Sequence, residues 1–343
     1  MDAKKNALIA SLLVLVVLIS PPLVASEKFI EIQKIRTILE LPDDQIDLAA
    51  AKLTIDRLVD PSIDEAATQK QIDHIVMAVN RMVSETVPAG QATHDRKMQA
   101  LRSYLYDAGE WNQQHVFQYD LDDPFGTHRF ENRLLSTYLQ TRKGNCFSMP
   151  ILFLILGDKL GLDVTLSTAP YHVFIKYWDD QGRWLNLETT SGAKPAREVW
   201  LRQQFDITET ALNNGLYLQP LSRKESVAVM ASLVMEHAIR QGKYIKAGKI
   251  ADLLLQYYPK HIYALTQKAT AISHYITREF ESKYPRPIDI PTDQRGFYAY
   301  LDKMNYDLLA KAKYLGWRRT TAKGDERYLQ KIEQYKQTKQ LTH

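Results

Sequence analysis

The sequence of 343 residues contains a single cysteine, Cys146. One thiol forms no disulfide within its own chain and no cysteine-rich zinc site. The sequence also lacks a glycine-rich phosphate loop, an HExxH pair, a serine nucleophile elbow and an EF-hand loop. These absences exclude the commonest sequence signatures of nucleotide, zinc-hydrolase, serine-hydrolase and calcium sites, and we therefore expect neither a metal nor a cofactor.

An excess of charge of one sign is also missing. Lys and Arg total 44 against 40 Asp and Glu, so the formal net charge is +4. Domains that bind nucleic acids usually concentrate basic residues on one face, and an excess this small predicts no nucleic-acid partner. Apolar residues make up 45% of the chain, which is enough to fill a core and excludes wholesale disorder.

The longest uncharged run lies at the N-terminus. Two lysines precede a run without charge from residue 7 to residue 20, and two prolines end it. This is the pattern of an export signal, and the run is short for a spanning helix of about 20 residues. We expect residues 1–26 to be a signal peptide, or an uncleaved anchor that tethers the protein to the membrane through residues 7–20. Either interpretation predicts a protein that is periplasmic or anchored to the inner membrane facing the periplasm.

The middle of the chain carries the only strand patterns. Helical periodicity holds from residue 27 to about residue 107, and between residues 164 and 190 the apolar period changes to two. The sequence Asp-Asp-Gln-Gly at 179–182 is a turn whose glycine tolerates a positive φ. The strands that it joins, 173–178 and 183–188, are expected to form an antiparallel hairpin.

The last third of the chain is helical again. Four residues have the relative spacing of a tetratricopeptide repeat: Gly242, Tyr244, Ala247 and Pro259. The small Ala247 lets two helices approach closely, and Pro259 ends the second helix. A second, incomplete unit is interrupted by three prolines in residues 281–296. An ordinary helical hairpin is the alternative interpretation.

Cys146 occupies a position at which a thiol can be activated. Gly144 is a turn residue, Asn145 is a good helix N-cap, and the run from residue 147 to residue 160 is apolar nearly all round, as in a buried helix. Unpaired backbone N–H groups and the positive end of the helix dipole favour a thiolate at such a position. The same N–H groups could stabilise an oxyanion.

A thiol nucleophile needs a base, and His172 is the best candidate because it begins a strand of the hairpin. Glu188, 16 residues later on the partner strand, could orient the imidazole, with Asn186 as the alternative. We therefore expect Cys146, His172 and Glu188 to be the catalytic residues. The competing interpretation is structural, since a free cysteine is among the most often buried residues.

These residues carry a family resemblance. The segments Gly144-Asn145-Cys146, His172-Val-Phe-Ile and Trp184-Leu-Asn-Leu-Glu188-Thr-Thr resemble the bacterial transglutaminase-like superfamily. The stretch 130–144 and the helical lead-in are similar to its SirB-type core, which is followed by tetratricopeptide repeats. The resemblance implies an α+β, papain-like fold, in which a helix that carries the cysteine packs on a small antiparallel sheet that carries the histidine and the acid.

The resemblance also implies residues of the cleft. Asn132, Gln140 and Asn145 are the candidates to bind an oxyanion or to line the cleft. Two features depart from the pattern. The usual third residue of the superfamily is Asp, whereas this chain has Glu188, and SirB-type members often lack the cysteine that is retained here as Cys146.

Together these patterns predict four parts. They are a signal peptide or anchor at 1–26, a transglutaminase-like core with a helical lead-in at 27–222, tetratricopeptide-like helical repeats at 223–316, and a basic polar tail at 317–343.

The predicted function is an exported Cys-His-Glu thiol acyl-transfer enzyme, either a peptidase or amidase or a transglutaminase. Its partner would be a protein or peptide that binds through the cleft and the helical repeats. The alternative is a non-catalytic scaffold of the same fold that binds a peptide or protein in the cell envelope. The sequence determines neither the acyl acceptor nor the oligomeric state.

Overall fold

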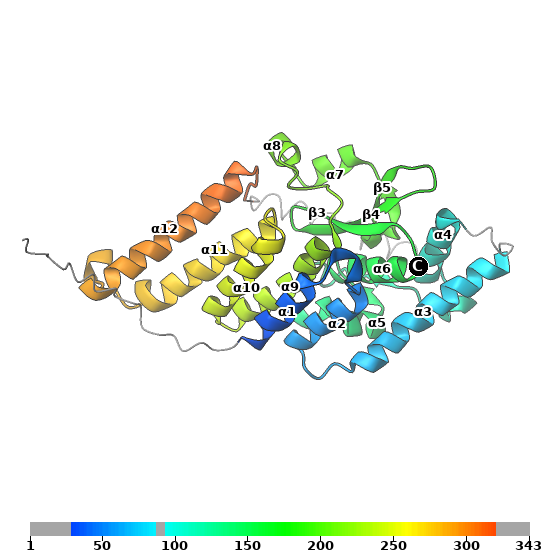
Figure 1. Cartoon of the computed structure of the whole chain (residues 1–343), viewed down its shortest axis with the longest axis horizontal. Helices are drawn as coiled ribbons and strands as arrows, with labels where there is room; N and C mark the ends of the chain where they lie inside the picture. The colour runs from blue at the N-terminus through cyan, green and yellow to red at the C-terminus, as the bar shows by residue number, and fades with distance from the viewer. Residues whose placement is uncertain (1–28, 87–92, 320–343) are drawn as a thin grey trace, which may run out of the picture.

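The computed structural model describes residues 29–86 and 93–319. The expected signal or anchor at 1–26 and the tail from residue 320 onward lie outside these ranges. Figure 1 shows an elongated molecule, with a small sheet and its covering helices at one end and a series of helices extending to the other end. Within the described ranges, no helix combines the length and the apolar character needed to cross a membrane.

Helices make up most of the described chain. The first group is α1 (Ile30–Glu40), α2 (Leu48–Val59), α3 (Glu65–Thr86) and α4 (His94–Tyr106). The middle group is α5 (Leu135–Thr141), α6 (Ser148–Lys159), α7 (Glu198–Gln204) and α8 (Glu209–Asn213). The last group is α9 (Arg223–Arg240), α10 (Tyr244–Tyr257), α11 (Ile262–Ile276) and α12 (Thr292–Tyr314). The predicted mixed, helix-rich architecture is confirmed.

Side-chain caps determine where several helices begin. The carboxylate of Asp47 accepts hydrogen bonds from the first N–H groups of α2, and the hydroxyl of Thr93 does the same for α4. Ser222 and Glu225 form a reciprocal capping box at the start of α9. The last group of helices therefore begins at this capping box, which follows the region that holds the sheet.

Four short strands form an antiparallel sheet in the order β3–β4–β5–β6. They are β3 (Val164–Ala169), β4 (His172–Trp178), β5 (Trp184–Glu188) and β6 (Lys194–Ala196). The predicted hairpin of β4 and β5 is confirmed, with Ile175 opposite Leu187. A separate parallel pair joins β1 (Gln118–Tyr119) to β2 (Lys143–Gly144), immediately before Cys146.

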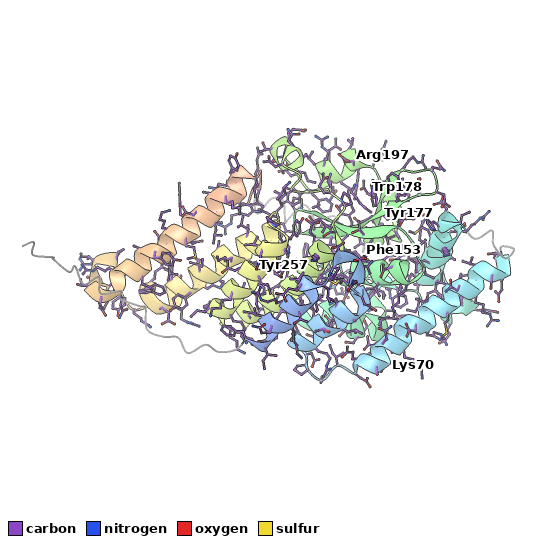
Figure 2. All side chains as sticks on the ribbon, viewed as in Figure 1. Lys70, Phe153, Tyr177, Trp178, Arg197 and Tyr257 are labelled. Atoms are coloured by element: carbon purple, nitrogen blue, oxygen red, sulfur yellow. The ribbon has the colours of Figure 1, made fainter. Side chains whose placement is uncertain are left out.

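The turn end of the hairpin is anchored at the surface. Trp178 and Trp184 face each other across the two strands in an edge-to-face contact, with their ring centroids 5.3 Å apart. Tyr177 precedes Trp178 in β4 (Figure 2), and its hydroxyl donates a 2.6 Å hydrogen bond to Asp95 of α4. This contact fixes the turn end of the hairpin, and the opposite end holds His172.

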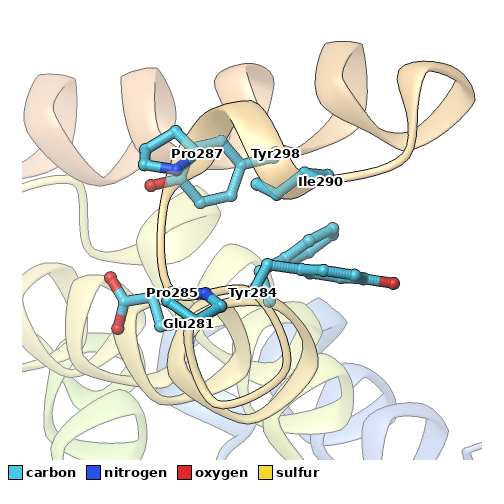
Figure 3. Close-up of a pocket in the computed structure, with 7 residues that line it drawn as sticks. Glu281, Tyr284, Pro285, Pro287, Ile290 and Tyr298 are labelled. Carbon is cyan, nitrogen blue, oxygen red and sulfur yellow. The ribbon is translucent and has the colours of Figure 1, made fainter.

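The last four helices pack one against the next, α9 on α10, α10 on α11 and α11 on α12. Gly242 turns the chain between α9 and α10 with a φ of +69°, and Ala247 is fully buried in α10. A pocket of about 300 Å³ lies between the end of α11 and the start of α12 (Figure 3). Its lining is mostly aromatic and proline rings: Phe280, Glu281, Tyr284, Pro285, Pro287, Ile290 and Tyr298.

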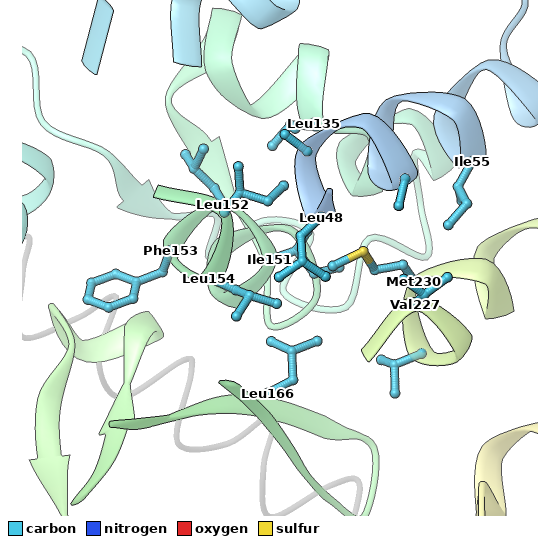
Figure 4. Close-up of a cluster of buried hydrophobic side chains, with 14 of the residues drawn as sticks. Leu48, Ile55, Leu135, Ile151, Leu152, Phe153, Leu154, Leu166, Val227 and Met230 are labelled. Atoms are coloured by element: carbon cyan, nitrogen blue, oxygen red, sulfur yellow. The ribbon is translucent and has the colours of Figure 1, made fainter. Parts of the chain in front are cut away.

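Helix α6 lies at the centre of the main core. Every residue from 148 to 157 is buried, as expected for a helix that is apolar all round. Figure 4 shows Leu154 of α6 facing Leu166 of β3, with Leu48 of α2 and Val227 of α9 in the same cluster. Because alternate strand residues point to opposite faces, the other face of the sheet packs against a second cluster that includes residues of α7 and α8.

A buried ion pair joins α2 to the segment before α6. The side chains of Lys52 and Asp56 are both fully buried and are paired with each other. The ammonium of Lys52 also donates to the carbonyl of Arg133 at 3.3 Å, and Asp56 accepts from the N–H of Leu135, at the start of α5, at 2.8 Å. Burial lowers the pKa of Lys52 and raises the pKa of Asp56, and the attraction between the two charges opposes both shifts.

The Asp56→Asn variant tests this pair. We expect it to lower the free energy of unfolding by about 3–5 kcal/mol, because the ammonium of Lys52 stays buried without its counter-charge. Chemical denaturation at pH 7 measures the loss. The matched control is Asp73→Asn, since Asp73 is half-exposed and lies 3.8 Å from Lys159. The control should change stability by less than about 0.5 kcal/mol, and an equal effect of both variants would contradict the expectation.

Candidate functional site

Cys146 lies two residues before the first residue of α6, and 7% of it is exposed. The side chain of Asn145 organises this helix start, because its oxygen accepts hydrogen bonds from the N–H groups of Phe147 and Ser148, both at 3.0 Å. The sulfur of Cys146 lies 3.9 Å from the carbonyl oxygen of Tyr171. The thiol is therefore at the N-terminal end of the buried helix and faces the turn that precedes β4.

His172 and Glu188 form a buried pair on the sheet. The Nε2 atom of His172 lies 2.6 Å from a carboxylate oxygen of Glu188, and both residues are only 5% exposed. The strand register explains the contact: Ile175 faces Leu187, so Glu188 and His172 are diagonal neighbours on one face. Such a diagonal spans about 7–8 Å between backbones, and the additional methylene of Glu relative to Asp helps to bridge it.

The electrostatics of the pair favour charge on both groups. Burial lowers the pKa of His172, but the carboxylate of Glu188 and the thiol of Cys146 outweigh this effect and raise it to about 10. Burial likewise raises the pKa of Glu188, whereas His172 and hydrogen bonds from Thr190 lower it below its usual value. With Nε2 bound to Glu188, Nδ1 is the ring nitrogen that remains for Cys146. The three side chains selected from the sequence thus lie together.

Two aromatic residues lie at the site although no pattern in the sequence indicates them. The ring of Phe205, just after α7, stacks on the imidazole of His172, with centroids 4.6 Å apart and an interplanar angle of 18°. Tyr171 is half-exposed and has a φ of +55°, a conformation that costs a non-glycine residue about 1–3 kcal/mol. This turn places the carbonyl of Tyr171 against the thiol.

A buried carboxylate accepts several hydrogen bonds in the loop before α5. Asp123 accepts hydrogen bonds from the backbone N–H groups of residues 127, 128 and 129 and from the side-chain amide of Asn132. The neighbouring carbonyl of Pro124 accepts the N–H of Cys146 at 3.4 Å. Asp123 therefore positions a segment that touches the nucleophile candidate, although the sequence shows it only as part of an Asp-Asp-Pro turn.

The predicted cleft residues have different surroundings. The amide of Asn132 donates to Asp123 at 2.8 Å, and the amide of Asn145 donates to the carbonyl of Asn132 at 3.0 Å. Gln140 is exposed on α5. The N–H groups of residues 146 and 147, which were expected to hold an oxyanion, already donate to Pro124 and Asn145. An oxyanion at this position would have to replace the long bond to Pro124.

The remaining candidates lie away from the thiol. The amide of Asn186, the alternative orienting residue, donates to the carbonyl of Ala196 on β6 at 3.2 Å. The described residues contain no group of three or more His, Cys, Asp or Glu side chains arranged to hold a metal ion. The pocket between α11 and α12 is lined by none of the site residues.

Comparisons with known proteins bear on this geometry. Residues 66–232 match the model of the transglutaminase-like superfamily, a range that includes all three site residues. The chain is 23% identical over 193 residues to the UPF0162 protein BU173 of Buchnera aphidicola subsp. Acyrthosiphon pisum (strain APS). This alignment covers 54% of the chain and 66% of that relative's length. No solved structure matches the chain. The resemblance to the transglutaminase-like superfamily is thus confirmed for the domain at 66–232.

The Glu188→Gln variant tests the charged pair through the pH dependence of stability. The pKa of His172 is about 10 in the folded protein and about 6.5 in an unfolded chain, so the pair stabilises the fold fully below about pH 6.5 and loses this contribution as the pH rises to 10. The gap in unfolding free energy between the wild type and Glu188→Gln should therefore be larger at pH 6 than at pH 10.

Urea denaturation at the two pH values measures this gap. The matched control is Glu65→Gln, because Glu65 pairs at the surface with Arg57, whose charge does not titrate in this range. The control gap should be small and equal at both pH values. A Glu188→Gln gap that stays constant between pH 6 and pH 10 would count against the charged His172–Glu188 pair.

Proposed function

We propose that this protein is a thiol acyl-transfer enzyme that acts on a protein or peptide substrate, with Cys146, His172 and Glu188 as its catalytic residues. The observation that carries the proposal is the geometry near the start of α6: His172 is bonded to Glu188 through Nε2, and the thiol of Cys146 lies 3.9 Å from the carbonyl of Tyr171, the residue directly before His172. A nucleophile, a base and a group that orients the base are the three parts that such catalysis needs.

The proposed reaction has two steps. The thiolate of Cys146 attacks a carboxamide or peptide carbonyl, the C–N bond breaks, and the imidazolium of His172 gives its proton to the leaving amine. Water or a second amine then attacks the thioester, His172 accepts its proton, and the C–S bond breaks to release the product and the thiolate of Cys146. In the first step the N–H of Cys146 would give up its 3.4 Å hydrogen bond to the carbonyl of Pro124 and donate to the developing oxyanion instead. Water as acceptor gives a peptidase or amidase, and an amine gives a transglutaminase.

The alternative function is a non-catalytic scaffold that binds a peptide or protein. Two observations favour it: Cys146 is only 7% exposed, and the N–H groups nearest to it have partners in the protein. In this case the His172–Glu188 pair would stabilise the sheet, and the thiol would have no chemical role.

The finer parts of the proposal concern the rest of the chain. We propose a SirB-type core followed by tetratricopeptide-like helices that bind the partner. The φ of +69° at Gly242 and the fully buried Ala247 support the repeat assignment. The uncharged run at residues 7–20 supports export to the periplasm, either as a free protein or with a membrane tether.

Alkylation of the single cysteine separates the two functions. Mass spectrometry after treatment with iodoacetamide reports Cys146 alone, because the chain contains no other thiol. We expect His172→Ala to slow alkylation at pH 7 by about 10-fold or more, because an unassisted thiol is only slightly ionised at that pH. The control is His128→Ala, since the side chain of His128 is 75% exposed. Equal rates in the wild type and in His172→Ala would support the scaffold.

A second assay distinguishes the acyl acceptor. Casein and a fluorescent primary alkylamine are incubated with the wild type and with Cys146→Ser. Label attached to casein only with the wild type indicates amine transfer, and new peptide ends without label indicate hydrolysis.

A further inference from the structure

Arg133 lies behind the nucleophile candidate and contacts both segments that hold it. Its side chain is only 12% exposed, and its Nε donates to the carbonyl of Phe125 at 2.9 Å. Its guanidinium faces the ring of Phe147, with Cζ 6.0 Å from the centroid. Phe147 directly follows Cys146, and Phe125 directly follows Pro124, whose carbonyl accepts the N–H of Cys146. A buried cation is thus adjacent to the backbone on both sides of the thiol.

The counter-charge of Arg133 comes from the C-terminal helices. The guanidinium is paired with Glu236 of α9, and the hydroxyl of Tyr263 of α11 donates to the same carboxylate at 2.7 Å. Arg240, one turn after Glu236 in α9, lies 3.5 Å from the other oxygen of that carboxylate and stacks over Phe130. Two helices from the last third of the chain therefore hold Arg133 in place.

The other buried cation near Phe147 is Lys52, which is paired with Asp56. Lys52 of α2 donates to the carbonyl of Arg133 and lies 5.5 Å from the ring centroid of Phe147, but Asp56 neutralises it. Burial lowers the pKa of Arg133, but the negative charge of Glu236 outweighs this effect and raises it above its usual value. Arg133 thus remains charged, and its guanidinium contacts the residues that flank the thiol on both segments.

We propose that Arg133 is a positioning residue that holds a positive charge beside the thiolate of Cys146, with Glu236 of α9 as its anchor. This inference rests on the proposed function. A cation near a cysteine favours the thiolate, and inside a protein its effect is stronger than in water. The helices α9 and α11 are then part of the active site and not only a binding module.

The test compares the full-length wild type with Arg133→Gln and Arg133→Lys by the rate of iodoacetamide alkylation from pH 5 to pH 9. We expect Arg133→Gln to slow alkylation at pH 7 by about 10-fold. The profile of rate against pH should move to higher pH by about one unit, which is the displacement that a 10-fold change corresponds to. Arg133→Lys should restore most of the rate because it keeps the charge. The matched control is Arg129→Gln in the same loop, since Arg129 is 64% exposed and should change the rate less than about 2-fold.

The outcomes separate this inference from the proposed function. An unchanged profile in Arg133→Gln, together with slow alkylation in His172→Ala, overturns the role of Arg133 and leaves the acyl-transfer proposal intact. A slow wild-type reaction that His172→Ala does not alter overturns both. If circular dichroism shows that Arg133→Gln is unfolded, Glu236→Gln decides: the amide keeps a hydrogen-bond acceptor for Arg133 but removes the counter-charge, so alkylation at pH 7 should speed up, and an equal or lower rate overturns the inference.

Discussion

Burial of helix α6 on all sides is the constraint on which the arrangement of the site depends. Residues 148–157 are buried, with the sheet on one side and the helices α2, α3, α4 and α5 packed around the others. The N–H groups at the start of such a helix need partners from the protein, because water is excluded there. Asn145 and Pro124 supply them, and in doing so they hold the segment that carries Cys146 against the end of the sheet.

The same burial explains why the charges near α6 occur in pairs. A buried charge without a partner is expensive, and three of the buried charges have an opposite charge as partner: His172 has Glu188, Lys52 has Asp56 and Arg133 has Glu236. Only the first pair lies within one hairpin. The others connect α2 and α9 to the loop that precedes the nucleophile candidate, so the charges around the site come from helices far apart in the sequence.

The sequence predicted those features whose signals are local. The hairpin, the buried helix and the contact of His172 with Glu188 follow from periodicity, a turn and the spacing of 16 residues. The pairing of Arg133 with Glu236 spans 103 residues, and no pattern within one element indicates such a contact. The satisfied N–H groups at Cys146 and the ring of Phe205 on His172 depend on tertiary packing in the same way.

Helix α9 belongs to the same hydrophobic core as α2 and α6. Val227 and Met230 of α9 lie in the same cluster as Leu152 of α6 and Ile55 of α2 (Figure 4), so residue 222 marks a change of secondary structure while the core continues across it. A chain cut at that position would leave the apolar surface of α2 and α6 facing water. The part that holds the site residues and the C-terminal helices are therefore joined by one continuous hydrophobic core.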